Sequence, residues 1–71
     1  MRGSQNFKWD GAVMKARRTF LDISLAELGE LIGTSRSYLW EIEEGSQPTA
    51  GYAYHIAKIL KKPVSFFIRE C

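Results

Sequence analysis

Four side chains with different binding chemistry fall close together near the middle of the sequence: Arg36, Ser37, Trp40 and Glu41. If this segment is helical, the spacing places them on one face, because residues three or four apart are neighbours on a helix. A guanidinium can bind guanine through two hydrogen bonds, a hydroxyl can donate or accept, an indole can contact a thymine methyl group, and a carboxylate can accept from cytosine. The set therefore has the chemistry needed to recognise base edges.

Residues suited to catalysis or metal binding are sparse. The chain has one His, His55, and one Cys, Cys71, and neither has a partner at ligand spacing. Glu41 and Glu44 are three residues apart, but no Gly-rich phosphate loop or Ser/His/Asp set accompanies them. We therefore expect no enzymatic activity, no metal, no cofactor and no small-molecule ligand.

Length and composition narrow the class of protein further. The 71 residues make one small domain, near the size at which a single core barely outweighs chain entropy, so dimerisation would help. No apolar run is long enough to cross a membrane, and no apolar segment typical of a secretory signal follows the first basic residues. Since the one Cys fits a reducing compartment, we expect a cytoplasmic protein.

The periodicity of apolar residues predicts several short helices. Residues 1–12 are expected to form a flexible arm, of which residues 1–4 resemble an expression-vector leader, and residues 13–71 to form the folded domain. No run of alternating β-branched residues occurs, so we expect an all-α fold. Helices are predicted over residues 12–21, 24–32, 36–44 and 50–61, with a fifth short helix starting at Pro63.

Capping signals predict a tight turn between the second and third helices. Ser24 and Glu27 have the spacing of a capping box, and Gly33 is suited to a left-handed helix end. Ser35 can cap the next helix two residues later. Two short helices joined by a turn that contains Gly are typical of a helix-turn-helix.

This segment resembles the Cro/repressor (XRE-type, lambda-repressor-like) helix-turn-helix family. The family pattern is roughly Thr/Ser-Gln-x-x-Leu-Ala, then Gly-Val-Ser, then a helix ending Ile-x-x-Ile-Glu-x-Gly. This chain has Ser-Leu-Ala-Glu-Leu-Gly from Ser24, Gly-Thr-Ser from Gly33 and Leu-Trp-Glu-Ile-Glu-Glu-Gly from Leu39. The resemblance covers residues 14–68 and implies a compact five-helix DNA-binding domain.

The resemblance also implies roles for individual residues. Helix 36–44 would enter the major groove of double-stranded DNA, with Arg36, Ser37, Trp40 and Glu41 facing the bases. Arg18, which falls on an apolar helix face, would form a structural ion pair with Glu43. The DNA backbone would be contacted from the helix starts, the following loop and the arm, through Ser24, Leu25, Ser35, Ser46, Gln47, Gly51 and Lys8.

Together these implications predict a sequence-specific transcriptional regulator, a repressor of the phage Cro-like or antitoxin-like type. We expect a homodimer on a palindromic operator, because one such module buries too little surface for tight specific binding. The predicted interface consists of Phe66, Phe67 and Ile68, and one of the two phenylalanines should instead cover the end of the core.

The charge distribution leaves an alternative open. Residues 24–45 carry five acidic residues and one basic residue, a net charge of −4, which is unfavourable for a surface that meets a polyanion. Leu25 stands where the family commonly has Gln, and Leu cannot hydrogen-bond to phosphate. Leu25, Tyr38 and Trp40 could form an exposed apolar patch. The alternative is a helix-turn-helix fold that binds another protein through its third helix.

Overall fold

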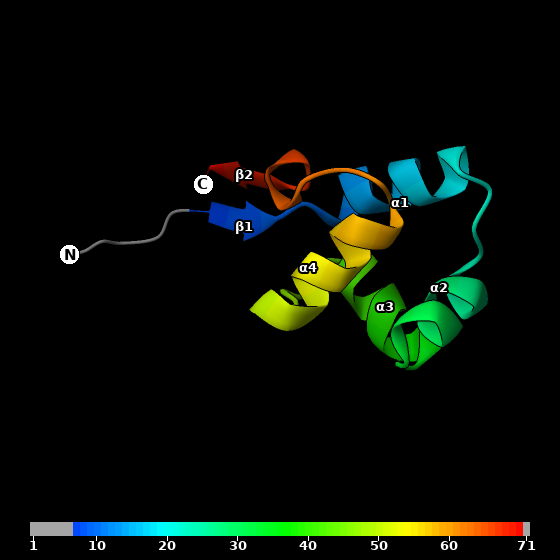
Figure 1. Ribbon diagram of the computed structural model, residues 1–71. Coiled ribbons are helices and arrows are strands. Elements are labelled where there is room, and N and C mark those ends of the chain that lie inside the picture. The colour runs from blue at the N-terminus through cyan, green and yellow to red at the C-terminus, as the bar shows by residue number, and fades with distance from the viewer. Residues whose placement is uncertain (1–6, 71) are drawn as a thin grey trace.

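The computed structural model describes residues 7–70. Its elements are β1 (Phe7–Trp9), α1 (Gly11–Phe20), α2 (Leu25–Ile32), α3 (Arg36–Glu43), α4 (Ala50–Ile59), a 3₁₀ turn (Val64–Phe66) and β2 (Ile68–Glu70). The helices surround one core, and β1 and β2 pair antiparallel at one end of the molecule (Figure 1). No helix in this part of the chain is long and apolar enough to cross a membrane.

The turn between α2 and α3 follows from its capping residues. At the start of α2, Ser24 Oγ accepts from the Glu27 N–H at 3.0 Å, and the Glu27 carboxylate accepts from the Ser24 N–H at 2.9 Å. Gly33 ends α2 with φ 89°, a conformation that other residues rarely adopt. Ser35 then caps α3. These local interactions confine the turn to three residues and so bring α3 back across α2.

The core is formed by one narrow face of each helix. Within α2, Leu28 is fully buried, whereas Leu31, three residues later, is 63% exposed. The eight-residue α2 packs against α3 and α4 through a face too narrow to include it. The buried apolar residues are Trp9, Met14, Leu28, Leu39, Ile42, Ile56, Ala57, Leu60 and Phe67.

The expectation of five helices is wrong, because residues 7–70 contain four α-helices. The segment after Pro63 makes only the 3₁₀ turn and then becomes extended as β2. It does so because β2 pairs with β1, with Trp9 opposite Ile68 and Phe7 opposite Glu70. The fold is helical, as expected, with one small antiparallel sheet added.

The expectation of a flexible arm over residues 1–12 also needs correction. Trp9 is only 3% exposed, stacks on Phe67 with ring centroids 5.0 Å apart, and directs its Nε1–H at Met14 Sδ. The Asp10 carboxylate caps α1, which starts at Gly11. Residues 7–12 thus belong to the folded domain, and residues 1–6 lie outside the described part of the chain.

Candidate nucleic-acid interface

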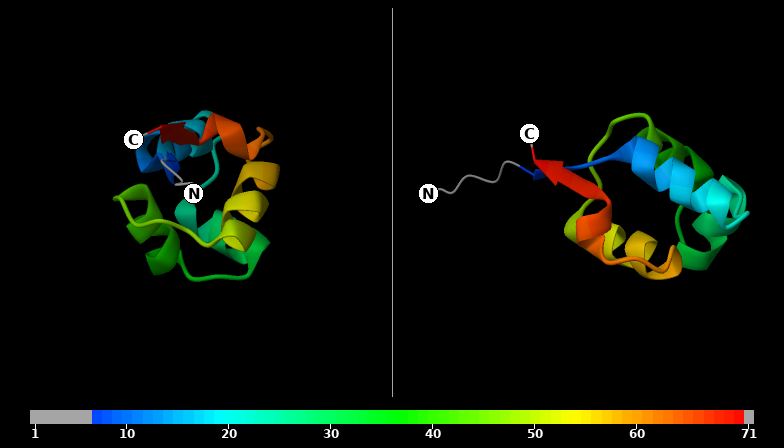
Figure 2. Two further views of the ribbon diagram at one scale, coloured as in Figure 1. Left: turned by 90° about the vertical axis from the view of Figure 1, so that its left-hand side faces the viewer. Right: turned by 90° about the horizontal axis from the view of Figure 1, so that it is seen from above.

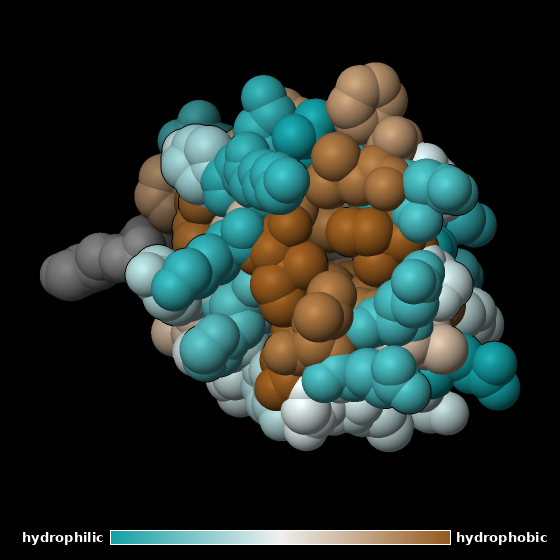
Figure 3. All heavy atoms as spheres, turned by 45° about the vertical axis from the view of Figure 1, so that its right-hand side comes forward, coloured by the Kyte–Doolittle hydropathy of each residue, from teal (hydrophilic) through white to brown (hydrophobic). Residues whose placement is uncertain are grey.

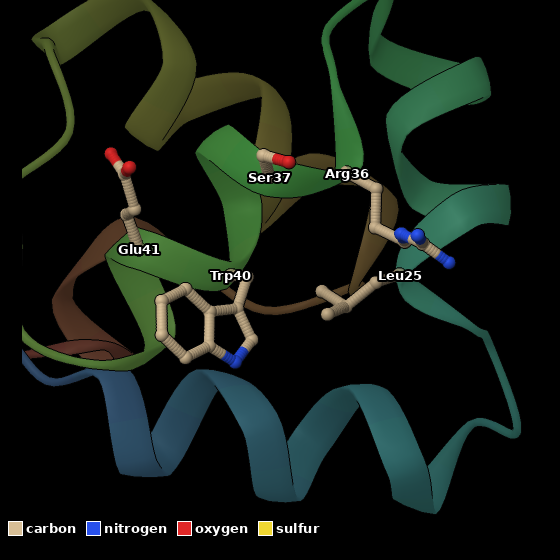
Figure 4. A pocket seen from close by; sticks show the side chains of 5 residues that line it. All are labelled: Leu25, Arg36, Ser37, Trp40 and Glu41. Atoms are coloured by element: carbon tan, nitrogen blue, oxygen red, sulfur yellow. The ribbon is translucent and has the colours of Figure 1, made fainter.

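A hollow of about 540 Å³ opens between the start of α2 and the outer face of α3 (Figure 4). The four residues expected to recognise base edges therefore share one surface. Leu25, expected to contact the DNA backbone, instead forms an apolar wall of this hollow beside them. The lining residues are Leu25, Arg36, Ser37, Trp40 and Glu41.

The polar and aromatic groups of the hollow are available for a ligand. Within residues 7–70, Arg36 and Glu41 form no ion pair, and Trp40 belongs to no aromatic pair. Trp40 is 54% exposed, and Arg36, Ser37 and Glu41 are also exposed. Arg36 and Ser37 lie in the first turn of α3, where the helix dipole favours nearby negative charge.

A buried ion pair positions the helix that carries these groups. Arg18 Nε lies 2.7 Å from Glu43 Oε2, and Arg18 Nη2 lies 3.1 Å from Glu43 Oε1. Arg18 Nη1 also donates to the Ile23 carbonyl at 2.8 Å. The guanidinium therefore joins α1, the α1–α2 connection and the last turn of α3, and Arg18 and Glu43 form the expected ion pair.

The residues expected to contact the DNA backbone do not form one group. Ser24 and Ser35 lie at exposed helix starts, where their hydroxyls accept from the N–H groups of Glu27 and Tyr38. Ser46 and Gly51 are exposed at the loop after α3 and at the start of α4. These four positions are compatible with a phosphate contact.

Gln47 is held within the protein instead. Its Oε1 accepts from the Trp9 N–H at 2.7 Å, and its Nε2 donates to the Trp9 carbonyl at 3.3 Å. The side chain thus ties the α3–α4 loop to β1, and its amide is not free to bind phosphate. Lys8 lies in β1 of the two-stranded sheet, at the opposite end of the molecule from α2 (Figure 2). The backbone-contact assignment of Gln47 and Lys8 is therefore not supported by their positions.

Tyr38 does not join Leu25 and Trp40 in an apolar patch. It is half-buried and packs against Tyr52 of α4, with ring centroids 5.0 Å apart. Because Tyr38 and Trp40 are two residues apart, they point to different sides of α3. The patch considered in the sequence analysis is therefore reduced to Leu25 and Trp40.

The three residues expected at a dimer interface differ in exposure. Phe67 is fully buried against Trp9 and cannot contact a partner, so its assignment is wrong. Phe66 is 44% exposed and lines an apolar groove of about 290 Å³ with Phe20 and other residues of α1. Ile68 is half-buried in β2. Figure 3 shows apolar side chains gathered between polar margins on the face seen there.

Other candidate sites carry little chemistry. His55 is exposed and meets the Tyr54 ring edge-on, with ring centroids 6.0 Å apart. Within residues 7–70, no group of three or more His, Cys, Asp or Glu residues could hold a metal ion. Cys71 lies outside the described residues.

Comparisons with known proteins agree with this architecture. A helix-turn-helix family model matches residues 14–67. No curated protein matches the sequence. The crystal structures of Fe(II) HppE and of Fe(II)-HppE with the alternative substrate (S)-1-HPP are similar, each with a TM-score of 0.70, 24% identity and 83% of this chain covered. The chain spans 32% and 31% of those two chains, and at this identity the likeness shows the fold alone.

Proposed function

Because this chain belongs to the Cro/XRE-type helix-turn-helix family of DNA-binding regulators, we propose that it is a sequence-specific transcriptional regulator. The observation that carries the proposal is the gathering of Arg36, Ser37, Trp40 and Glu41 on the exposed face of α3. Each of these side chains can recognise a base edge in the major groove. The proposed action is repression through occupancy of an operator in the cytoplasm, without catalysis.

We further propose that two copies bind a palindromic operator together. A single helix-turn-helix module buries too little surface for tight specific binding, and two-fold symmetry places two copies of α3 in successive major grooves. Phe66 and Ile68 supply the apolar contact between copies in this proposal. Phe66 ends the 3₁₀ turn and Ile68 begins β2, and neither lines the hollow on α3.

The test is selection of binding sites from randomised duplex DNA at low salt. The natural sequence and the variants Arg36→Ala and Arg69→Ala are compared. Arg69 is the control, because it is an arginine of β2 away from α3, with a side chain that is 65% exposed and pairs with Asp10 at 3.2 Å. We expect a two-fold symmetric motif for the natural sequence and for Arg69→Ala, and no such motif for Arg36→Ala.

The second candidate function is binding of another protein through α3. The net charge of −4 over residues 24–45 and the exposed indole of Trp40 favour it. Salt dependence separates the two functions. Binding to DNA releases counterions, and added salt makes this release less favourable, so DNA affinity falls steeply with salt, whereas an apolar protein contact is little affected. Weak, unselective DNA binding with no enriched motif supports the protein-binding alternative.

A further inference from the structure

The hollow on α3 combines a free cation with apolar walls, and this combination points to a particular DNA feature. We propose that it recognises a pyrimidine with a 5-methyl group, thymine or 5-methylcytosine, in the base-pair step next to a guanine. This inference rests on the proposed function, since it assigns the sequence step that the same surface prefers.

The guanine part of the proposal rests on Arg36. Its side chain is exposed in the first turn of α3 and forms no ion pair within residues 7–70. An arginine at the start of a recognition helix reaches the major groove, where guanine presents two acceptors, O6 and N7, that match the guanidinium fork. Among residues 7–70, no other cation lines the hollow.

The methyl part rests on Leu25 and Trp40. In Figure 4 the Leu25 side chain projects between the Arg36 guanidinium and the Trp40 indole, from the first turn of α2. A guanidinium bound to guanine would thus have apolar side chains beside it, at the edge of the neighbouring base pair. The 5-methyl group is the apolar group that a pyrimidine presents in the major groove. Leu25 and Trp40 together would remove it from water.

Charge makes this apolar contact important for selectivity. The helix-turn-helix segment has one cation against five carboxylates, so this segment itself supplies little attraction to phosphate. Glu41, at the edge of the hollow, adds a carboxylate that can accept from an amino group of cytosine or adenine. Phosphate contacts carry no sequence information directly, so discrimination between sequences depends on the groups that contact base edges.

The experiment starts from the duplex that the full chain selects from the randomised pool, and it removes or adds one methyl group at a time. Each thymine next to a guanine is replaced by deoxyuridine, and each cytosine next to a guanine by 5-methylcytosine, one position at a time. We expect about a four-fold loss of affinity for the deoxyuridine that faces the hollow and about a four-fold gain for 5-methylcytosine at a cytosine there, as burial of one methyl group gives.

Protein variants test whether the hollow is responsible. In Trp40→Ala and Leu25→Ala, the ratio of affinities for the thymine and deoxyuridine duplexes should fall towards one. Phe7→Ala is the matched control, because Phe7 is 57% exposed, close to the 54% of Trp40, but lies in β1. It should keep the four-fold ratio. Thermal unfolding of each variant checks that it is folded.

The outcomes separate this inference from the function on which it rests. Equal affinity with and without the methyl group at every such position, or a ratio that neither variant changes, overturns the inference and leaves the proposed function standing. The selected site can also lack a thymine next to a guanine. If 5-methylcytosine next to a guanine then adds no affinity either, the inference is overturned as well. Selection without any enriched motif overturns both.

Discussion

Arg18 and Glu43 meet through two hydrogen bonds, of 2.7 and 3.1 Å, between α1 and the last turn of α3. Arg18 is 8% exposed and Glu43 is 9% exposed. A buried ion pair of this kind adds little stability over apolar residues of the same size, but removal of one partner leaves an uncompensated charge in the core. The orientation of α3, and thus of its outer face, depends on both residues being present.

The variant Glu43→Leu alone is expected to lower the free energy of unfolding by about 3–5 kcal/mol, because Arg18 loses its partner. Urea denaturation measures this change. The double variant Arg18→Met/Glu43→Leu should recover most of the loss, because no buried charge remains. A double variant no more stable than the single one would contradict this account of the pair.

Gly11→Ala is expected to destabilise the fold by about 1–3 kcal/mol, the usual cost of overpacking. A Cβ at Gly11 would overlap the backbone oxygens of Ile42 and Glu43, where α1 begins against the end of α3. Gly51→Ala is the matched control in α4, where no atom lies within 4 Å of the added Cβ. It should raise stability by about 0.4–1 kcal/mol. Thermal unfolding that shows the same sign for both would contradict the close packing at Gly11.

Gln47→Ala is expected to lower the free energy of unfolding by about 1–2 kcal/mol, since it removes the two hydrogen bonds to the Trp9 backbone. DNA affinity of the folded protein should change little. Ser46→Ala, at the adjacent exposed position, should show the reverse pattern, with weaker DNA binding and unchanged stability. Urea denaturation and a DNA titration on both variants check this contrast.

Phe66→Ser is expected to raise the dissociation constant of the proposed dimer at least ten-fold, because burial of a phenyl ring contributes about 1.5–3 kcal/mol. Sedimentation equilibrium measures the change. The control is Tyr54→Ser, at an exposed aromatic on α4. A natural sequence that stays monomeric at concentrations that occupy the operator, or a Phe66→Ser variant that dimerises equally well, counts against Phe66 as the contact.

Those parts of the fold that depend on local signals could be predicted from the sequence. The capping box at Ser24, the left-handed Gly33 and the cap at Ser35 act within a few residues, and all three are present. The role of Trp9 could not be predicted, because its partner Phe67 lies almost at the other end of the chain. The pairing of β1 with β2 is equally long-range, and it leaves a 3₁₀ turn and a strand where a fifth helix was expected.

The candidate site also contains residues whose positions could be predicted from local spacing and residues whose positions could not. Helical spacing suffices to place Arg36, Ser37, Trp40 and Glu41 on one surface, because that surface belongs to a single helix. The positions of Leu25 and Gln47 depend on contacts between elements. Leu25 comes from α2 into the hollow, and Gln47 is drawn to β1, 38 residues away in sequence.

The pairing of β1 with β2 has a consequence for the order in which the chain folds. Since its two strands come from opposite ends of the described chain, their pairing closes almost the whole domain into one loop. Loop-closure entropy makes such a contact unfavourable until its ends are already held close, whereas the contacts of α2 with α3 need only a short loop. The helices should therefore assemble first, and the stacking of Trp9 on Phe67 should complete the core as the final step of folding.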